Sequence, residues 1–192
     1  MKKFPLVLDV ETKYSFRDFD DPKKLQVSVV AVFDYKTNQA KVFEEKEIGN
    51  LFTLFENASY LVGYNIFNFD LAVLSAYYPG DIRVFSVFDI LDDIKEKIGK
   101  RVSLNEVVYA TLGKKKSGHG FQAIDYYREG KITELKKYCL NDVILTKEIF
   151  DYGIEKGEIY YPSLNGKVAI KVNWKKYIED EEKKDTPLTL PF

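Results

Sequence analysis

The sequence is poor in the residues that most often bind zinc or form disulfides: among 192 residues it has one cysteine, Cys139, and one histidine, His119. A single cysteine excludes an internal disulfide, and one cysteine with one histidine cannot supply a Cys/His zinc site. Long apolar runs are absent as well, because the run near the amino end is interrupted by Asp9 and Glu11. We therefore expect no signal peptide and no membrane span, and a cytoplasmic protein.

An excess of charge of one sign is also missing, since the formal net charge is −1. The chain is thus no bulk polycation, and any contact with nucleic acid must come from local patches. With 45% hydrophobic and 31% charged residues, the composition is that of a globular protein with a substantial core. No repeat or linker divides the chain, so we expect one domain over residues 1–174 and an acidic, proline-containing tail over residues 175–192.

Hydrophobic periodicity predicts an α/β fold in which strands come first and then alternate with helices. Residues 4–10, 25–34 and 39–45 read as an antiparallel meander, and 60–65 and 82–88 as further strands. The expected helices, several of them closing at a glycine, cover residues 47–58, 68–78, 89–99, 103–113, 121–130 and 132–153. Residues 157–174 predict a C-terminal β-hairpin that turns at Asn165 and Gly166.

Two carboxylates end the first strand. Asp9 and Glu11 are two positions apart, so in an extended strand they project from the same face. Like charges at the tip of a buried strand repel each other and lose hydration, which a divalent cation would compensate. The alternative is a strand that simply ends in a solvated acidic turn.

Further acidic positions fall at junctions of the predicted elements. Asp70 lies where a strand passes into a helix. The alternative is that it is only a charge partner of the helix N-terminus. Tyr138 and Asp142 are four residues apart and therefore share one face of the last long helix. The alternative for this pair is an exposed aspartate with the tyrosine packed at the rim of the core.

Together these positions form three motifs in a fixed order: Asp9-x-Glu11, Asn65-x-x-x-Phe69-Asp70 and Tyr138-x-x-x-Asp142. In order and placement they resemble the three motifs of the DEDD superfamily of ribonuclease H-like 3′→5′ exonucleases, in its tyrosine (DEDDy) branch. That branch includes the proofreading domains of family B DNA polymerases. The chain is also similar to small stand-alone domains regarded as exonucleases of this kind. The resemblance covers roughly residues 4–153, and the hairpin fits segments appended to those small domains.

The resemblance implies a fold, an activity and a cofactor. The fold is a ribonuclease H-like mixed sheet of three antiparallel and two parallel strands flanked by helices. The activity is metal-dependent 3′→5′ exonucleolytic hydrolysis of single-stranded nucleic acid, with DNA favoured over RNA and a role in DNA repair. Two Mg²⁺ or Mn²⁺ ions would be the cofactors. By this analogy Asp9 bridges both ions, Glu11 and Asp142 complete the first site, Asp70 supports the second, and Tyr138 orients the attacking water.

The same resemblance suggests residues that bind the 3′ end of the strand. Val10 and Thr12 would flank the terminal nucleotide through their backbones, while Asn65 and Phe69 would contact the strand or support the site. For Phe69, packing in the core is the open alternative. A basic loop, residues 114–120, includes Lys116, which would contact phosphates unless the run of lysines is merely a solvated face. His119 lies in this loop, far from Asp142 in sequence, and is interpreted as a solvated residue.

Two other function classes remain open on the sequence: a catalytically weak domain that binds nucleic acid, and an interaction module built on a nuclease-like scaffold. The tail adds to the second possibility. Residues 178–192 combine acidic residues with an apolar end carrying Leu188, Leu190, Pro191 and Phe192. This end loosely resembles the tails of bacterial single-stranded-DNA-binding proteins. A partner-binding peptide, an arm that docks on this chain or another copy, and a frayed terminus are the three readings.

Overall fold

The computed structural model describes residues 3–115 and 121–178. A five-stranded mixed sheet with the order β3-β2-β1-β4-β5 forms its centre. The strands β1 (Phe4–Thr12), β2 (Val27–Asp34) and β3 (Gln39–Glu44) are antiparallel, whereas β4 (Ala58–Gly63) and β5 (Val87–Asp89) run parallel to β1. This arrangement confirms the α/β class and the expected mixed sheet of three antiparallel and two parallel strands.

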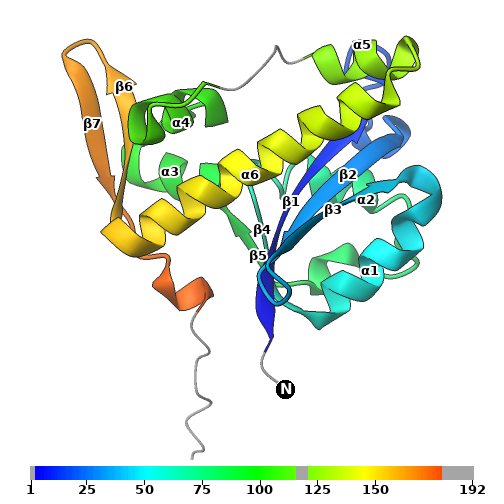
Figure 1. The fold of residues 1–192 in the computed structure, drawn as a ribbon, viewed down its shortest axis with the longest axis horizontal. Helices are drawn as coiled ribbons and strands as arrows, with labels where there is room; N and C mark the ends of the chain where they lie inside the picture. The colour runs from blue at the N-terminus through cyan, green and yellow to red at the C-terminus, as the bar shows by residue number, and fades with distance from the viewer. Residues whose placement is uncertain (1–2, 116–120, 179–192) are drawn as a thin grey trace, which may run out of the picture.

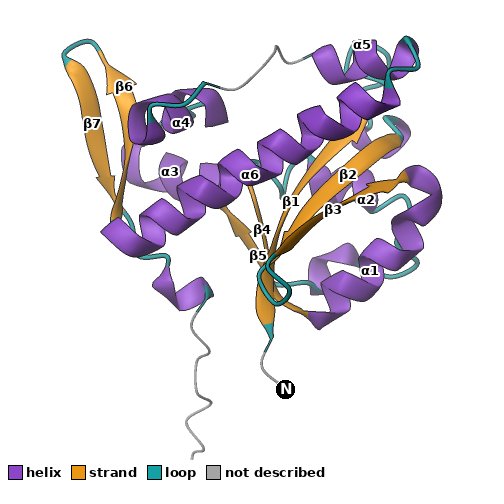
Figure 2. Ribbon diagram, in the orientation of Figure 1, coloured by secondary structure: helices purple, strands orange, loops and turns teal. Residues whose placement is uncertain are grey.

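Six α-helices within the described residues surround the sheet (Figure 2). They are α1 (Ile48–Asn57), α2 (Asp70–Leu74), α3 (Ile90–Ile98), α4 (Leu104–Leu112), α5 (Gln122–Arg128) and α6 (Ile132–Lys156). Short 3₁₀ turns cover Pro22–Lys24, Glu45–Glu47, Ile82–Val84 and Lys175–Tyr177. No helix in the described ranges is long and apolar enough to cross a membrane.

Side chains of β1 alternate between two apolar cores, one on each face of the sheet. Leu6, Leu8 and Val10 pack with α1 and α2 in one core, while Val7 packs in the other with α3, α4 and α6. Figure 1 shows α6 crossing the sheet obliquely, from the lower left to the upper right of the view. Because side chains alternate along a strand, Asp9 and Glu11 share the face of Val7, which is the face that α6 covers.

Several predicted element boundaries are wrong, among them the strand expected over residues 60–65, which is Ala58–Gly63, and the helix expected over 68–78, which is Asp70–Leu74. Two further differences have a clear physical cause. The strand expected over residues 82–88 begins only at Val87, because Asp81 accepts a hydrogen bond from the Arg83 amide at 3.0 Å and starts a 3₁₀ turn instead. The last helix does not close at Gly153 but continues to Lys156. A Cβ at Gly153 would lie 2.2 Å from the Trp174 ring, so this glycine is a packing site for the indole, not a helix terminus.

The predicted hairpin is present as β6 (Glu158–Ser163) and β7 (Gly166–Lys171), with its turn one residue earlier than expected, at residues 164–165. It forms a separate two-stranded sheet beside α4 (Figure 1). Thr111 of α4 fastens it, because its hydroxyl donates to the Tyr160 carbonyl at 3.1 Å and accepts from the Tyr160 amide at 2.9 Å. The hairpin is thereby held to the helical layer.

The start of the expected tail lies against the body of the protein. Residues Lys175–Tyr177 form a 3₁₀ turn, and the Tyr177 ring stacks on Phe88 of β5 with 4.0 Å between centroids. Residues 179–192, on which the partner-binding interpretation depends, lie outside the described residues, as do Lys116 and His119.

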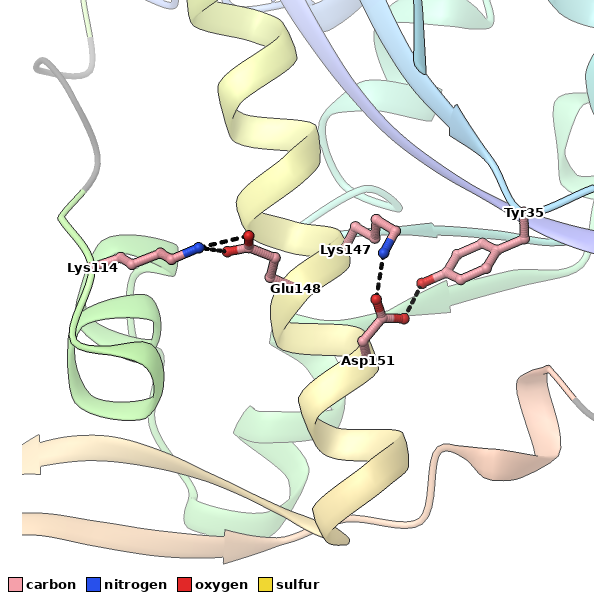
Figure 3. A network of polar contacts seen from close by, with 5 residues as sticks. All are labelled: Tyr35, Lys114, Lys147, Glu148 and Asp151. Carbon is pink, nitrogen blue, oxygen red and sulfur yellow. Dashed lines mark hydrogen bonds and ion pairs between the residues drawn. The ribbon is translucent and has the colours of Figure 1, made fainter. Parts of the chain in front are cut away.

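Polar contacts fix the C-terminal half of α6 on two sides (Figure 3). On one side Asp151 accepts hydrogen bonds from Lys147 and from the Tyr35 hydroxyl of the sheet layer. On the other side Lys114, just after α4, forms an ion pair with Glu148 at 2.6 Å. Burial, followed by the hydrogen bond to Asp151, raises the pKa of Tyr35, so its hydroxyl remains a donor. These contacts hold α6 at a set position over the sheet.

Candidate metal centre and its cleft

The first strand and the last helix bring three carboxylates together. Asp9 and Glu11 project from β1 toward α6, and Asp142 projects from α6 toward β1, where its side chain is buried with 2% exposure. One carboxylate oxygen from each of Asp9, Glu11 and Asp142 lies within 4.8 Å of the others. The interpretation of Asp142 as an exposed helix residue is therefore wrong. We refer to Asp9, Glu11 and Asp142 as the acidic triad.

The acidic triad has the chemistry of a site for a hard divalent cation. Carboxylate oxygens are the ligands that Mg²⁺ and Mn²⁺ prefer, and a spacing of this size lets one ion contact several carboxylates. Burial of Asp142 beside two further carboxylates costs free energy, because like charges repel each other and lose hydration. The residues present thus fit a divalent metal ion.

Asp70 lies next to the acidic triad and is held by the backbone of β1. It is the first residue of α2, is 4% exposed, and accepts a hydrogen bond from the Val10 amide at 2.8 Å. Burial, followed by the negative charge of Asp9, raises the pKa of Asp70 well above its ordinary value. The Val10 amide, expected to flank a nucleotide, is already bonded to this carboxylate.

Tyr138 comes one helical turn before Asp142 and is buried, with 7% of its surface exposed. Its ring meets the edge of the Tyr126 ring on α5 at 6.4 Å between centroids. Tyr138 and the acidic triad line the same cleft, which has a volume of about 400 Å³. The tyrosine is thus built into the wall of the cleft and does not lie at an exposed rim.

The other walls of the cleft come from α5, the start of α2 and the loop after β1. Val10, Thr12 and Phe69, all predicted to be substrate-binding, line it. Residues not singled out by the motifs complete the lining: Tyr14, Ser15, Phe16, Arg17, Leu25, Phe121 and Ile124. The rings of Phe16 and Phe69 meet edge to face at 6.0 Å, and the Arg17 guanidinium lies 4.6 Å from the centre of the Phe121 ring. Among the described residues, aromatic side chains and the Arg17 guanidinium therefore line the cleft beside the acids.

Asn65 does not line this cleft. Its backbone has a left-handed φ of 67°, and its side-chain oxygen accepts a hydrogen bond from Arg101 at 2.9 Å. The amide of Asn65 donates to Asp89 at 2.9 Å. In this structure Asn65 therefore shapes the loop before Asp70 and is joined to α3, which leaves Phe69 as the member of its motif that reaches the cleft.

Cys139 is a neighbour of the site that the sequence motifs did not reveal. Its Sγ lies 3.4 Å from the Asp9 carbonyl oxygen and 3.7 Å from Asp9 Oδ2, and the side chain has no exposed surface. Burial first, then the charges of Asp9 and Glu11, raise the pKa of the thiol well above its ordinary value. A protonated thiol thus packs behind the first carboxylate. Its position, one residue after Tyr138 on the buried side of α6, was the only signal in the sequence.

Comparisons with known proteins relate the chain to others through its fold. No protein-family model matches the chain, and no curated protein matches it. Among solved structures, it is similar to a family B DNA polymerase from the hyperthermophilic archaeon Pyrobaculum calidifontis, with a TM-score of 0.61 and 18% sequence identity. The match covers 80% of this chain and 25% of the polymerase chain. The chain thus has the fold of part of that polymerase and spans a quarter of its length.

Proposed function

We propose that the protein is a metal-dependent 3′→5′ exonuclease of the DEDDy type that releases nucleotides from single-stranded nucleic acid, with DNA favoured over RNA. The observation that carries the proposal is the convergence of Asp9, Glu11 and Asp142 with Tyr138 in one cleft. The likeness of the fold to part of a family B DNA polymerase supports a role on nucleic acid.

Each acidic residue has a place in this chemistry. Asp9, Glu11 and Asp142 would hold one Mg²⁺ or Mn²⁺, and Asp70, beside Asp9, would help to hold a second. Bound divalent ions would supply an activated water and stabilise charge on the leaving oxygen of an in-line phosphodiester hydrolysis. Asp70 is steadied for this role by the Val10 amide, which fixes one of its oxygens.

Tyr138 would place the attacking water by hydrogen bonding. It lines the cleft one helical turn from Asp142, and its ring is held against Tyr126. An ordinary tyrosine keeps its proton at neutral pH, so its hydroxyl serves to orient the water and not to deprotonate it.

The lining of the cleft suits the end of a flexible strand. Phe16 and Phe69 offer ring faces on which bases can stack, and stacking of this kind tolerates any base sequence. Arg17, kept over the Phe121 ring, offers a guanidinium for a backbone phosphate. Because Asp142 is buried at the floor of the cleft, a strand terminus reaches the acids more readily than the middle of a duplex does.

The test uses labelled oligonucleotides of DNA and RNA, single-stranded and duplex, each carrying its label at either the 5′ or the 3′ end. With Mg²⁺ or Mn²⁺ we expect a ladder from the 5′-labelled single strand and immediate release of mononucleotide from the 3′-labelled one. Chelator should stop both. Asp9→Ala should be inactive, while Glu134→Gln, which removes an exposed carboxylate from the same α6, should match the wild type.

A folded wild-type protein that leaves every oligonucleotide intact with either metal would refute the exonuclease proposal. Retention of labelled strands without degradation would then support the catalytically weak binding module. Absence of both degradation and retention would leave the interaction scaffold.

A further inference from the structure

Asp89 is a buried carboxylate outside the cleft that gathers backbone amides from two different segments. Its Oδ1 accepts from the amides of Asn65 at 2.9 Å, Leu91 at 3.0 Å and Asp92 at 3.4 Å. Its Oδ2 accepts from the Phe67 amide at 3.1 Å. The side chain therefore does more than cap α3, since half of these bonds lead to the loop between β4 and α2.

That loop, residues 64–69, is the segment that delivers Asp70 to the acidic triad. Asp89 lies directly across from Gly63 in the parallel pair of β4 and β5, so it stands beside the point where the loop leaves the sheet. The loop turns back tightly there, because a Cβ at Gly63 would lie 2.7 Å from the Ile66 Cβ. Three residues after the Phe67 amide, α2 begins with Asp70.

We propose that Asp89 is a positioning residue, which fixes the loop 64–69 through the amides of Asn65 and Phe67 and thereby sets the carboxylate of Asp70 against Asp9 and the Val10 amide. Asp89 holds the start and middle of the short loop, and the loop leads directly into Asp70. The role of Asp89 in catalysis rests on the proposed function, whereas its control of the position of Asp70 can be measured without any activity.

Asp89→Asn weakens the anchor of the loop and keeps the cap of α3. An asparagine can keep its carbonyl oxygen at the Oδ1 position, and asparagine is a good helix N-cap, so the bonds from the Leu91, Asp92 and Asn65 amides are preserved. Its NH₂ group replaces Oδ2, and because it cannot accept a hydrogen bond, the bond from the Phe67 amide is lost. Asp89→Ala removes both sets of bonds. Asp34→Asn is a matched control: Asp34 is buried and accepts from the Lys36 amide at 2.8 Å, in the turn after β2.

The first measurement is amide hydrogen exchange at Val10. This amide is bonded to Asp70 and has no bond to Asp89. We expect its exchange to rise about tenfold in both Asp89 variants, the factor that corresponds to losing a hydrogen bond of about 1.4 kcal/mol. Leu8 in the same strand and the Asp34→Asn protein should show wild-type exchange. Unchanged protection at Val10 in a folded Asp89→Asn protein would overturn the inference, whether or not the protein is a nuclease.

The second measurement is a double-mutant cycle on the rate of oligonucleotide hydrolysis. Asp89→Asn should lower kcat about tenfold in the wild-type background and cause no further loss in an Asp70→Ala background, where there is no carboxylate left to position. An equal loss in both backgrounds would mean that Asp89 acts only on general stability and would overturn the inference. If the wild type shows no hydrolysis, the proposed function fails, and the exchange at Val10 alone decides the role of Asp89.

Discussion

The two halves of α6 treat their carboxylates in opposite ways. In the C-terminal half, Asp151 faces Lys147 and Glu148 faces Lys114, so each acid meets a cation (Figure 3). In the N-terminal half, Asp142 faces the carboxylates of Asp9 and Glu11. Among the described residues, α6 therefore carries acids paired with lysines in one half and an acid packed beside two further carboxylates in the other. The ion pairs suit a structural role, and the cluster of like charges is an arrangement that a bound cation would stabilise.

The largest expected effect comes from making the same substitution in both halves. Asp142→Asn should lower the hydrolysis rate by at least about 10³-fold, in the range seen when a catalytic group is removed. It should leave the melting temperature in chelator equal or higher, because one like charge is removed from the acidic triad. The measurements are initial rates on a 5′-labelled single strand and thermal unfolding in chelator.

Asp151→Asn is the matched change about two and a half helical turns away. It should keep the activity and lower the melting temperature by a few degrees, as expected for about 1 kcal/mol in a chain of this size. If Asp142→Asn instead lowered the apo melting temperature more than Asp151→Asn, the acidic triad would be a structural cluster and the contrast between the two halves would be lost.

Tyr138→Phe is the next largest change. Deleting only the hydroxyl should slow hydrolysis by about 10²- to 10⁴-fold, the range for a positioned group of this kind. Divalent-metal binding, followed by titration calorimetry, should be unchanged. Tyr126→Phe is the control, because Tyr126 packs on the Tyr138 ring and its hydroxyl accepts from Gln122 at 2.6 Å. Equal rates for the wild type and Tyr138→Phe at saturating metal would exclude this tyrosine from the mechanism.

Addition of a divalent metal should stabilise the folded protein by neutralising the like charges of the acidic triad. Mg²⁺ or Mn²⁺ at about one hundred times its dissociation constant should stabilise the wild type by about 2.7 kcal/mol, or roughly 5–10 °C in melting temperature. Asp9→Ala should lose most of this shift, whereas Asp151→Asn should keep it. An equal shift in all three proteins would place the ion outside the acidic triad.

The pattern of residues predicted the sheet, the hairpin and the elements that carry Asp9, Glu11, Asp70, Tyr138 and Asp142, because period and spacing fix the face of a strand or helix. It did not predict the end of α6, since the reason that Gly153 lies within the helix is the Trp174 ring, a contact between distant positions. The same limit applies to Cys139 and Asp89. Their importance follows from the backbone groups that lie beside them in the folded protein. Those groups come from distant positions in the chain, so the local sequence does not predict the contacts.

The smallest expected effect concerns the pH dependence of stability. It compares two aspartates, Asp70 and Asp81, whose surroundings shift their pKa values in opposite directions. Burial and the charge of Asp9 raise the pKa of Asp70 in the folded protein. A raised pKa favours the protonated form in the folded state, so this contribution to stability is fully present below the unfolded pKa of about 3.9 and is lost as pH rises through the folded value. At pH 7, above the unfolded pKa, the burial of Asp70 beside Asp9 therefore destabilises the metal-free protein.

Asp70→Asn should accordingly raise the melting temperature in chelator at pH 7, since the amide keeps an acceptor for the Val10 N–H and removes the charge. The difference from the wild type should shrink toward zero as pH falls to about 4.

Asp81 should give a change in melting temperature of the opposite sign, because its hydrogen bonds from Arg83 lower its pKa to about 2. Asp81→Asn should therefore lower the melting temperature at pH 7, and this loss should vanish as pH falls toward 2. Thermal unfolding of both variants between pH 3 and pH 8 checks the signs, and a destabilised Asp70→Asn protein at pH 7 would show that the carboxylate is held by favourable contacts and not strained by its neighbours.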